Sequence, residues 1–174
     1  MYQPALWHDY FAVVGTGAAA LTGLVFVAMT LHLEEVTGDP VHRHRARTIL
    51  TGLTAVFIRC ALVLMGGQNA QAIAVEIIGV LLVVEAILYN SIRQAARSAD
   101  NGVLWRAIGS FACLVLEQIG ALILFWGNPA GLYVVGLGMM SSFIFMVTGA
   151  WLLLVGVGAQ QAAVSLRNVG DRDQ

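Results

Sequence analysis

Five apolar stretches, each long enough to cross a lipid bilayer, constrain this chain more than any other feature of its sequence. A helix needs roughly 20 mainly apolar residues to span the hydrocarbon core. The stretches run over residues 10–33, 48–67, 70–92, 103–126 and 132–158. The sequence therefore predicts an all-α integral membrane bundle of five transmembrane helices, which forms a single transmembrane domain over residues 1–174.

The composition agrees with a lipid environment. Hydrophobic residues make up 59% of the 174 residues and charged residues only 11%, whereas a soluble domain is about one quarter charged. All nine basic residues are arginines, and nothing in their spacing resembles a nucleic-acid footprint. The expected partner is therefore the lipid bilayer and not nucleic acid.

The arginines predict how the bundle is oriented. Apart from Arg59, they fall in three polar regions that five spans place on one side of the membrane. These are Arg43, Arg45 and Arg47 after the first span, Arg93, Arg97 and Arg106 around the third connection, and Arg167 and Arg172 in the tail. Because arginine favours the cytoplasmic side, we expect the N-terminus outside and the C-terminus inside. Residues 159–174 are then a short cytoplasmic tail.

Two connections between spans are short. The second and third spans are separated by "GGQNAQ", and the fourth and fifth by "GNPAG". Glycine, asparagine and proline favour tight turns, so each pair of spans is expected to form an antiparallel helical hairpin.

Three charged residues lie deep inside the predicted spans. Arg59 is near the middle of the second span, and Glu117 is near the middle of the fourth, which runs in the same direction. At about 1.5 Å per residue, the two lie at similar depths. A lone charge at the bilayer centre costs roughly 2.5–3.5 kcal/mol on insertion scales. We therefore expect Arg59 to meet Glu117, with Glu85 of the third span as second candidate or third member.

Small and polar residues share a face with two of these charges. On the second span the stripe holds Thr48, Gly52, Ala55, Arg59, Leu62 and Gly66, and on the fourth it holds Arg106, Ser110, Cys113, Glu117 and Gly120. Such stripes are typical of helix–helix contacts in membranes. The cluster is then either a structural ion pair or part of an ion, proton or solute pathway, and a surplus carboxylate would suit proton or cation binding.

Polar residues also gather on the predicted outer side, which carries carboxylates and no arginine. We interpret Asp9, Gln68, Asn69 and Glu76 as an outer mouth whose negative field favours cations. The alternative interpretation is that these residues are solvated loop ends.

Cofactors and catalysis find little support in the sequence. The first cytoplasmic loop holds possible metal ligands, namely His32, Glu34, Glu35, Asp39, His42 and His44. Their spacing matches no zinc pattern, and the neighbouring arginines oppose a cation. No histidine lies in the second to fifth spans to ligate a haem. Hydrolase and nucleotide-binding motifs are absent. The sequence thus predicts no metal, no cofactor and no enzymatic activity.

The first span carries Gly15, Ala19 and Gly23 at four-residue spacing. This pattern of small residues lets helices approach closely. We expect it to pack either within one subunit or between subunits.

The same span resembles a group of small, mostly uncharacterised bacterial multi-span inner-membrane proteins. The likeness rests on Phe11, Gly15, Ala19-Ala20-Leu21 and Gly23-Leu24-Val25-Phe26-Val27-Ala28, and it is confined to this span. The resemblance implies a multi-pass location in a bacterial inner membrane. It brings no functional residue with it.

Because five helices can barely enclose a polar route, a pathway is expected between subunits. The leading hypothesis is a homo-oligomeric membrane channel or transporter-like protein, in which protons or small cations pass the buried cluster of arginine and glutamate. The alternative is a non-conducting accessory or scaffold subunit of a larger membrane complex, in which the buried charges only hold helices together.

Overall fold

The computed structural model describes residues 7–31, 38, 40–96 and 101–170, and a helix stands at each of the five predicted spans. The helices are α1 (His8–Leu31), α3 (Pro40–Leu64), α4 (Ala70–Ala96), α5 (Asn101–Phe125) and α6 (Ala130–Gly170). Each of them is long and apolar enough to cross a membrane. The prediction of an all-α fold with five helices of transmembrane length and composition is confirmed.

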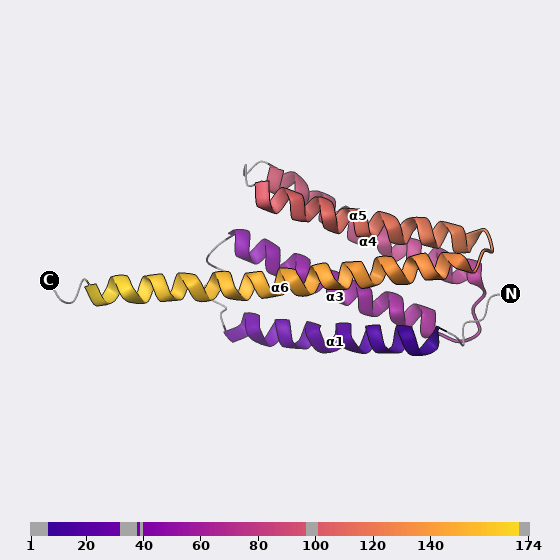
Figure 1. Ribbon diagram of the computed structural model, residues 1–174, viewed down its shortest axis with the longest axis horizontal. Helices are drawn as coiled ribbons and strands as arrows, with labels where there is room; N and C mark the ends of the chain where they lie inside the picture. The colour runs from indigo at the N-terminus through magenta and orange to yellow at the C-terminus, as the bar shows by residue number, and fades with distance from the viewer. Residues whose placement is uncertain (1–6, 32–37, 39, 97–100, 171–174) are drawn as a thin grey trace.

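The five helices run up and down beside one another (Figure 1). Both short connections lie at one end of the bundle, which we call the hairpin end. At the opposite end lie the N-terminal turns of α3, with Arg43 and Arg47, and the last turn of α4, with Arg93. We call this the arginine-rich end. Helices α3 and α5 therefore run in the same direction, as the sequence predicts for the helices that carry Arg59 and Glu117.

The two hairpin turns are built alike. Gly67 after α3 and Gly127 after α5 have φ angles of 84° and 83°, a conformation that only glycine adopts without strain. An asparagine then starts the following helix in each case. The side-chain oxygen of Asn69 accepts a hydrogen bond from the amide of Ala72 at 2.8 Å, and that of Asn128 accepts one from the amide of Ala130 at 3.0 Å. Both predicted hairpins are therefore present.

Helices α3 and α6 extend furthest beyond the spans expected from the sequence, by eight and twelve residues, both at the arginine-rich end. Helix α3 begins at Pro40 instead of residue 48, and α6 continues to Gly170 instead of ending at residue 158. At about 1.5 Å per residue, the 41 residues of α6 are about 60 Å long. The bilayer core is only about 30 Å thick. Residues 159–170 of the expected tail are thus a helical continuation of α6 (Figure 1).

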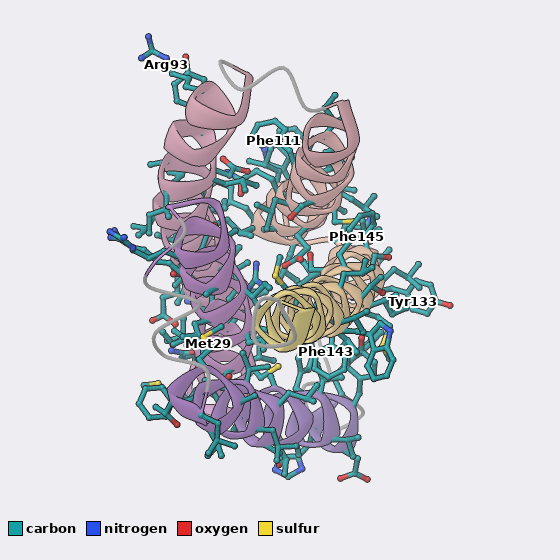
Figure 2. The ribbon with its side chains drawn as sticks, turned by 90° about the vertical axis from the view of Figure 1, so that its left-hand side faces the viewer. Met29, Arg93, Phe111, Tyr133, Phe143 and Phe145 are labelled. Carbon is teal, nitrogen blue, oxygen red and sulfur yellow. The ribbon has the colours of Figure 1, made fainter. Side chains whose placement is uncertain are left out.

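Helix α6 lies among the other helices. Figure 2 shows Phe145 of α6 directed toward α5 and Phe143 of the same helix directed toward α1. Helix α5 packs against α4 and α6, whereas α1 packs mainly against α3. At the hairpin end α1 also reaches α6, because the Tyr10 hydroxyl donates a hydrogen bond to the carbonyl oxygen of Gly136 at 2.6 Å. The centre of the bundle is therefore formed by α3, α4, α5 and α6.

Glycines bring α5 and α6 unusually close together. A Cβ atom at Gly131 would overlap the backbone of Leu124, and one at Gly120 would lie 2.6 Å from the amide nitrogen of Val135. Only hydrogen fits at these positions, so the two backbones touch directly. Such close approach increases the dispersion attraction between helices that have no hydrophobic driving force in lipid.

Candidate functional site

Arg59 and Glu117 form an ion pair in the middle of the bundle. Nη1 of Arg59 lies 2.7 Å from Oε2 of Glu117, and the two side chains are 1% and 0% exposed. The approach falls outside hydrogen-bond geometry, and neither atom has another polar partner. The contact is therefore mainly electrostatic. The expected meeting of these two residues is confirmed, and it takes place within a single chain.

Each member of the pair is held by a second polar contact. Nε of Arg59 donates a hydrogen bond to the carbonyl oxygen of Ala55, one turn earlier on α3, at 3.1 Å. The hydroxyl of Ser142 on α6 donates one to Oε1 of Glu117 at 2.7 Å. Hydrogen bonds to an ionised group are among the stronger ones in proteins. The carboxylate of Glu117 is thus fixed from α3 on one oxygen and from α6 on the other.

The backbone of α6 leaves room for this carboxylate at Gly138. A Cβ atom at Gly138 would overlap Cγ of Glu117 and would lie 3.0 Å from its amide nitrogen. Gly138 and Ser142 are four residues apart, so they share one face of α6. This face therefore supplies both the space and the hydrogen-bond donor for Glu117.

The stripes predicted on the second and fourth spans form the walls of this site. Gly52, Ala55 and Arg59 are buried on α3, and Ser110, Glu117 and Gly120 are buried on α5. The ends of the predicted stripes are less enclosed, since Gly66 is exposed. The side chain of Arg106 lies outside the described residues.

A small cavity adjoins the pair on the side of the arginine-rich end. It offers about 20 Å³ in which the centre of a water molecule fits, and its lining includes Arg59, Thr51, Ser110 and Ser142. A buried water needs roughly 10–15 Å³ of such space and two to four polar partners. The cavity therefore has the size for about one water beside the guanidinium.

Glu85, which was expected as a second candidate partner of Arg59 or as a third member of the cluster, is not brought into this site. The described residues form no hydrogen bond or ion pair with it, and its side chain is half-buried within the span Ala70–Tyr89. The positions of α4 that line the cavity beside Arg59 are held by Val84, Ile87 and Leu88. Glu85 thus stands at the edge of the inward face of α4.

The residues of the expected outer mouth lie at the hairpin end, but they do not form one cluster of contacting side chains. Nε2 of Gln68 contacts both carboxylate oxygens of Glu76, at 3.0 and 2.9 Å. Asn69 caps α4, as described above. Asp9 is exposed on α1 and contacts only the neighbouring His8 ring, at 3.3 Å. Within the described part of the chain, only Gln68 and Glu76 are joined.

Of the small residues of the first span, one is buried against a neighbouring helix and two are exposed. A Cβ atom at Gly15 would lie 2.9 Å from Cβ of Cys60, so this glycine allows α1 to approach α3. Ala19 and Gly23 are exposed, and nothing lies within 4 Å of a Cβ built at Gly23. Only the first of the three therefore packs within the subunit.

The possible metal ligands of the first loop fall mostly outside the described residues. His32, Glu34, Glu35 and Asp39 lie in the undescribed stretches, as do the side chains of His42 and His44. Among the residues that are described, no group of three or more histidine, cysteine or acidic side chains could hold a metal ion.

Sequence reasoning missed the specific role of Ser142. It is one of several hydroxyl-bearing residues in the last span, and the sequence does not single it out. Its spacing of four from Gly138 gives a small-residue pair of the kind found at helix contacts. This spacing indicates that the face of α6 with Gly138 and Ser142 contacts another helix, but it does not identify Glu117 as the residue that it contacts.

No protein-family model matches this chain, and no curated protein or solved structure does so either. Any function must therefore be argued from the geometry of the site.

Proposed function

We propose that this protein is a transporter-like carrier that moves protons across a bacterial inner membrane, with Glu117 as the proton-binding group and Arg59 as its fixed counter-charge. The observation that carries this proposal is the ion pair itself, since both partners are at most 1% exposed at the centre of five membrane-length helices. Ionisable groups at such depth are costly, and in membrane proteins they commonly mark ion or proton routes.

The proposal includes an orientation. The arginine-rich end lies in the cytoplasm and the hairpin end outside, because Arg43, Arg47 and Arg93 gather at the former. The cavity beside Arg59 then lies on the cytoplasmic side of the ion pair. On the outer side, Glu76 provides a carboxylate, which accepts hydrogen bonds from the side-chain amide of Gln68.

A proton suits this site better than a hydrated cation. The positive guanidinium of Arg59 repels a cation at the centre of the bundle. A proton needs only to reach the Glu117 carboxylate through water or hydroxyl groups such as Ser142. Toward the hairpin end the buried side chains of Ile77, Leu124 and Val135 fill the core. A carrier that opens to each side in turn fits this packing better than an open pore.

The proposal no longer needs a pathway between subunits, because the ion pair is completed within one chain. Self-association remains part of it for a different reason. Ala19 and Gly23 are exposed on α1, where a second copy could approach closely.

The test is proton uptake into proteoliposomes at an imposed membrane potential, followed with an enclosed pH dye. We expect uptake with the natural protein and with Ser141→Ala, a half-buried site next to Ser142 that does not contact the ion pair. We expect none with Arg59→Met/Glu117→Leu, which replaces the pair by apolar side chains and keeps the core filled. Equal uptake by the double variant would refute the proposal, as would no uptake by the natural protein.

A second candidate function is a non-conducting scaffold. It is favoured by the tight contact of Glu117 with Gly138 and Ser142, which would also suit a purely structural ion pair. In that case the natural protein shows no proton uptake, and the pair affects stability alone.

A further inference from the structure

An apolar groove lies between α3 and α4 on the surface that faces lipid. Its volume is about 510 Å³, within the roughly 300–1,000 Å³ of ordinary ligand pockets. One wall is formed by Leu50, Thr54 and Ile58 of α3, and the other by Gly79, Val83 and Ile87 of α4. Along α3 the groove extends over residues 50–58, which is about 12 Å at 1.5 Å per residue.

The groove is open along its length. Ile58 is 41% exposed and Val83 is 62% exposed. Nothing lies within 4 Å of a Cβ atom built at Gly79, so the absence of a side chain there deepens the groove. An apolar surface of this shape between two transmembrane helices accommodates a flexible hydrocarbon chain.

A positive charge stands at the end of the groove. Along α3 a residue borders the groove every three or four positions, at Leu50, Thr54 and Ile58. The same spacing continued toward the start of the helix reaches Arg47 and Arg43, so both arginines lie on the face of α3 that borders the groove. Arg47 is exposed one turn before Thr51, and no described carboxylate forms an ion pair with it. Arginine binds phosphate with good geometry, and basic residues at the membrane surface recognise anionic lipid head groups.

The charge also argues against a second copy of this chain as the occupant. Two copies joined by a two-fold axis along this face would bring Arg47 of each chain toward the other, and like charges disfavour such a contact. A phosphate, in contrast, complements the arginine.

We propose that the groove between α3 and α4 is a binding site for one anionic phospholipid of the leaflet at the arginine-rich end. One acyl chain lies between Ile58 and Val83, and the phosphate lies at Arg47. The site is separate from the proposed proton route, and it stands whether or not the protein carries protons.

The experiment is native mass spectrometry of the full chain in detergent, with phosphatidylglycerol or phosphatidylcholine of identical acyl chains added. We expect the natural protein to retain one phosphatidylglycerol in preference to phosphatidylcholine. Arg47→Gln removes the charge and should lower that preference about five-fold, since one arginine near the surface contributes about 1 kcal/mol. Gly79→Leu fills the groove and should reduce the binding of both lipids.

Matched substitutions elsewhere serve as controls. Gly23→Leu adds the same side chain at another exposed glycine, and Arg93→Gln removes an arginine at the same end of the bundle but on α4. Neither should change lipid retention. The proposal is overturned if Gly79→Leu retains lipid as the natural protein does, or if Arg93→Gln matches the effect of Arg47→Gln. It is equally overturned if Gly79→Leu changes the number of chains in the particle and leaves lipid binding unaltered.

Discussion

Glu117 is held in place by Ser142 as well as by Arg59, so the serine hydroxyl should contribute measurably to stability. Ser142→Ala would leave Oε1 of a buried carboxylate without a donor. Hydrogen bonds to charged groups are worth about 1.5–3 kcal/mol, and we expect a loss of that size in the free energy of unfolding. Unfolding in detergent micelles with increasing denaturant measures it.

The neighbouring serine provides the control for this substitution. Ser141 is half-buried, and its hydroxyl bonds only to the carbonyl oxygen of Leu137 on its own helix, at 2.9 Å. Ser141→Ala should change the free energy of unfolding by no more than about 0.5 kcal/mol. If both variants unfold alike, the hydroxyl of Ser142 does not support Glu117.

At this scale the sequence predicted the partners Arg59 and Glu117 but not their surroundings. Depth along a helix follows from counting residues, and that is enough to match two charges on helices that run in the same direction. Which side chains face each other depends on how each helix is rotated about its axis. Packing sets this rotation, which is why Glu85 was expected in the cluster and Ser142 was not recognised as a partner.

Between elements, the contact of α5 with α6 depends on glycines. Gly138→Ala would place a methyl group against Cγ of Glu117 and should push the two helices apart. Overpacking of this kind typically costs about 1–3 kcal/mol of unfolding free energy. The loss should appear in the same denaturant measurement.

Gly23→Ala is the appropriate comparison, because its methyl group would meet no neighbour within 4 Å. This variant should be neutral or slightly more stable, since alanine favours a helix over glycine by about 1 kcal/mol. A Gly138→Ala protein as stable as Gly23→Ala would show that α5 and α6 are not in close contact at this position.

The hydropathy of the sequence locates the helices but does not define all of their ends. Apolar length reflects the thickness of the bilayer, and it located all five helices, while the short connections rich in glycine and asparagine located both hairpins. It does not mark where a helix ends in water, so the first turns of α3 and residues 159–170 of α6 were not anticipated as helix. Nor does it show which helix is peripheral, as α1 is here.

For the whole molecule, the decisive property is that four helices of one chain enclose a complete ion pair. Arg59 comes from α3, Glu117 from α5 and Ser142 from α6, while α4 closes the cavity beside them. The sequence left open whether the acidic partner of Arg59 would come from the same chain or from a second copy. Glu117 lies at the same depth in the membrane in either copy, so its depth cannot distinguish the two. The site is therefore a property of the monomer, whatever its state of association.

A double-mutant cycle on Arg59 and Glu117 tests this account most directly. The free energy of unfolding in detergent would be measured for Arg59→Met, Glu117→Leu and the double variant. Each single change leaves one buried charge unpaired and should cost about 3–5 kcal/mol, whereas the double variant, with no charge left, should lose far less than the sum. Additive losses would contradict the account, because they would mean that the two side chains do not interact.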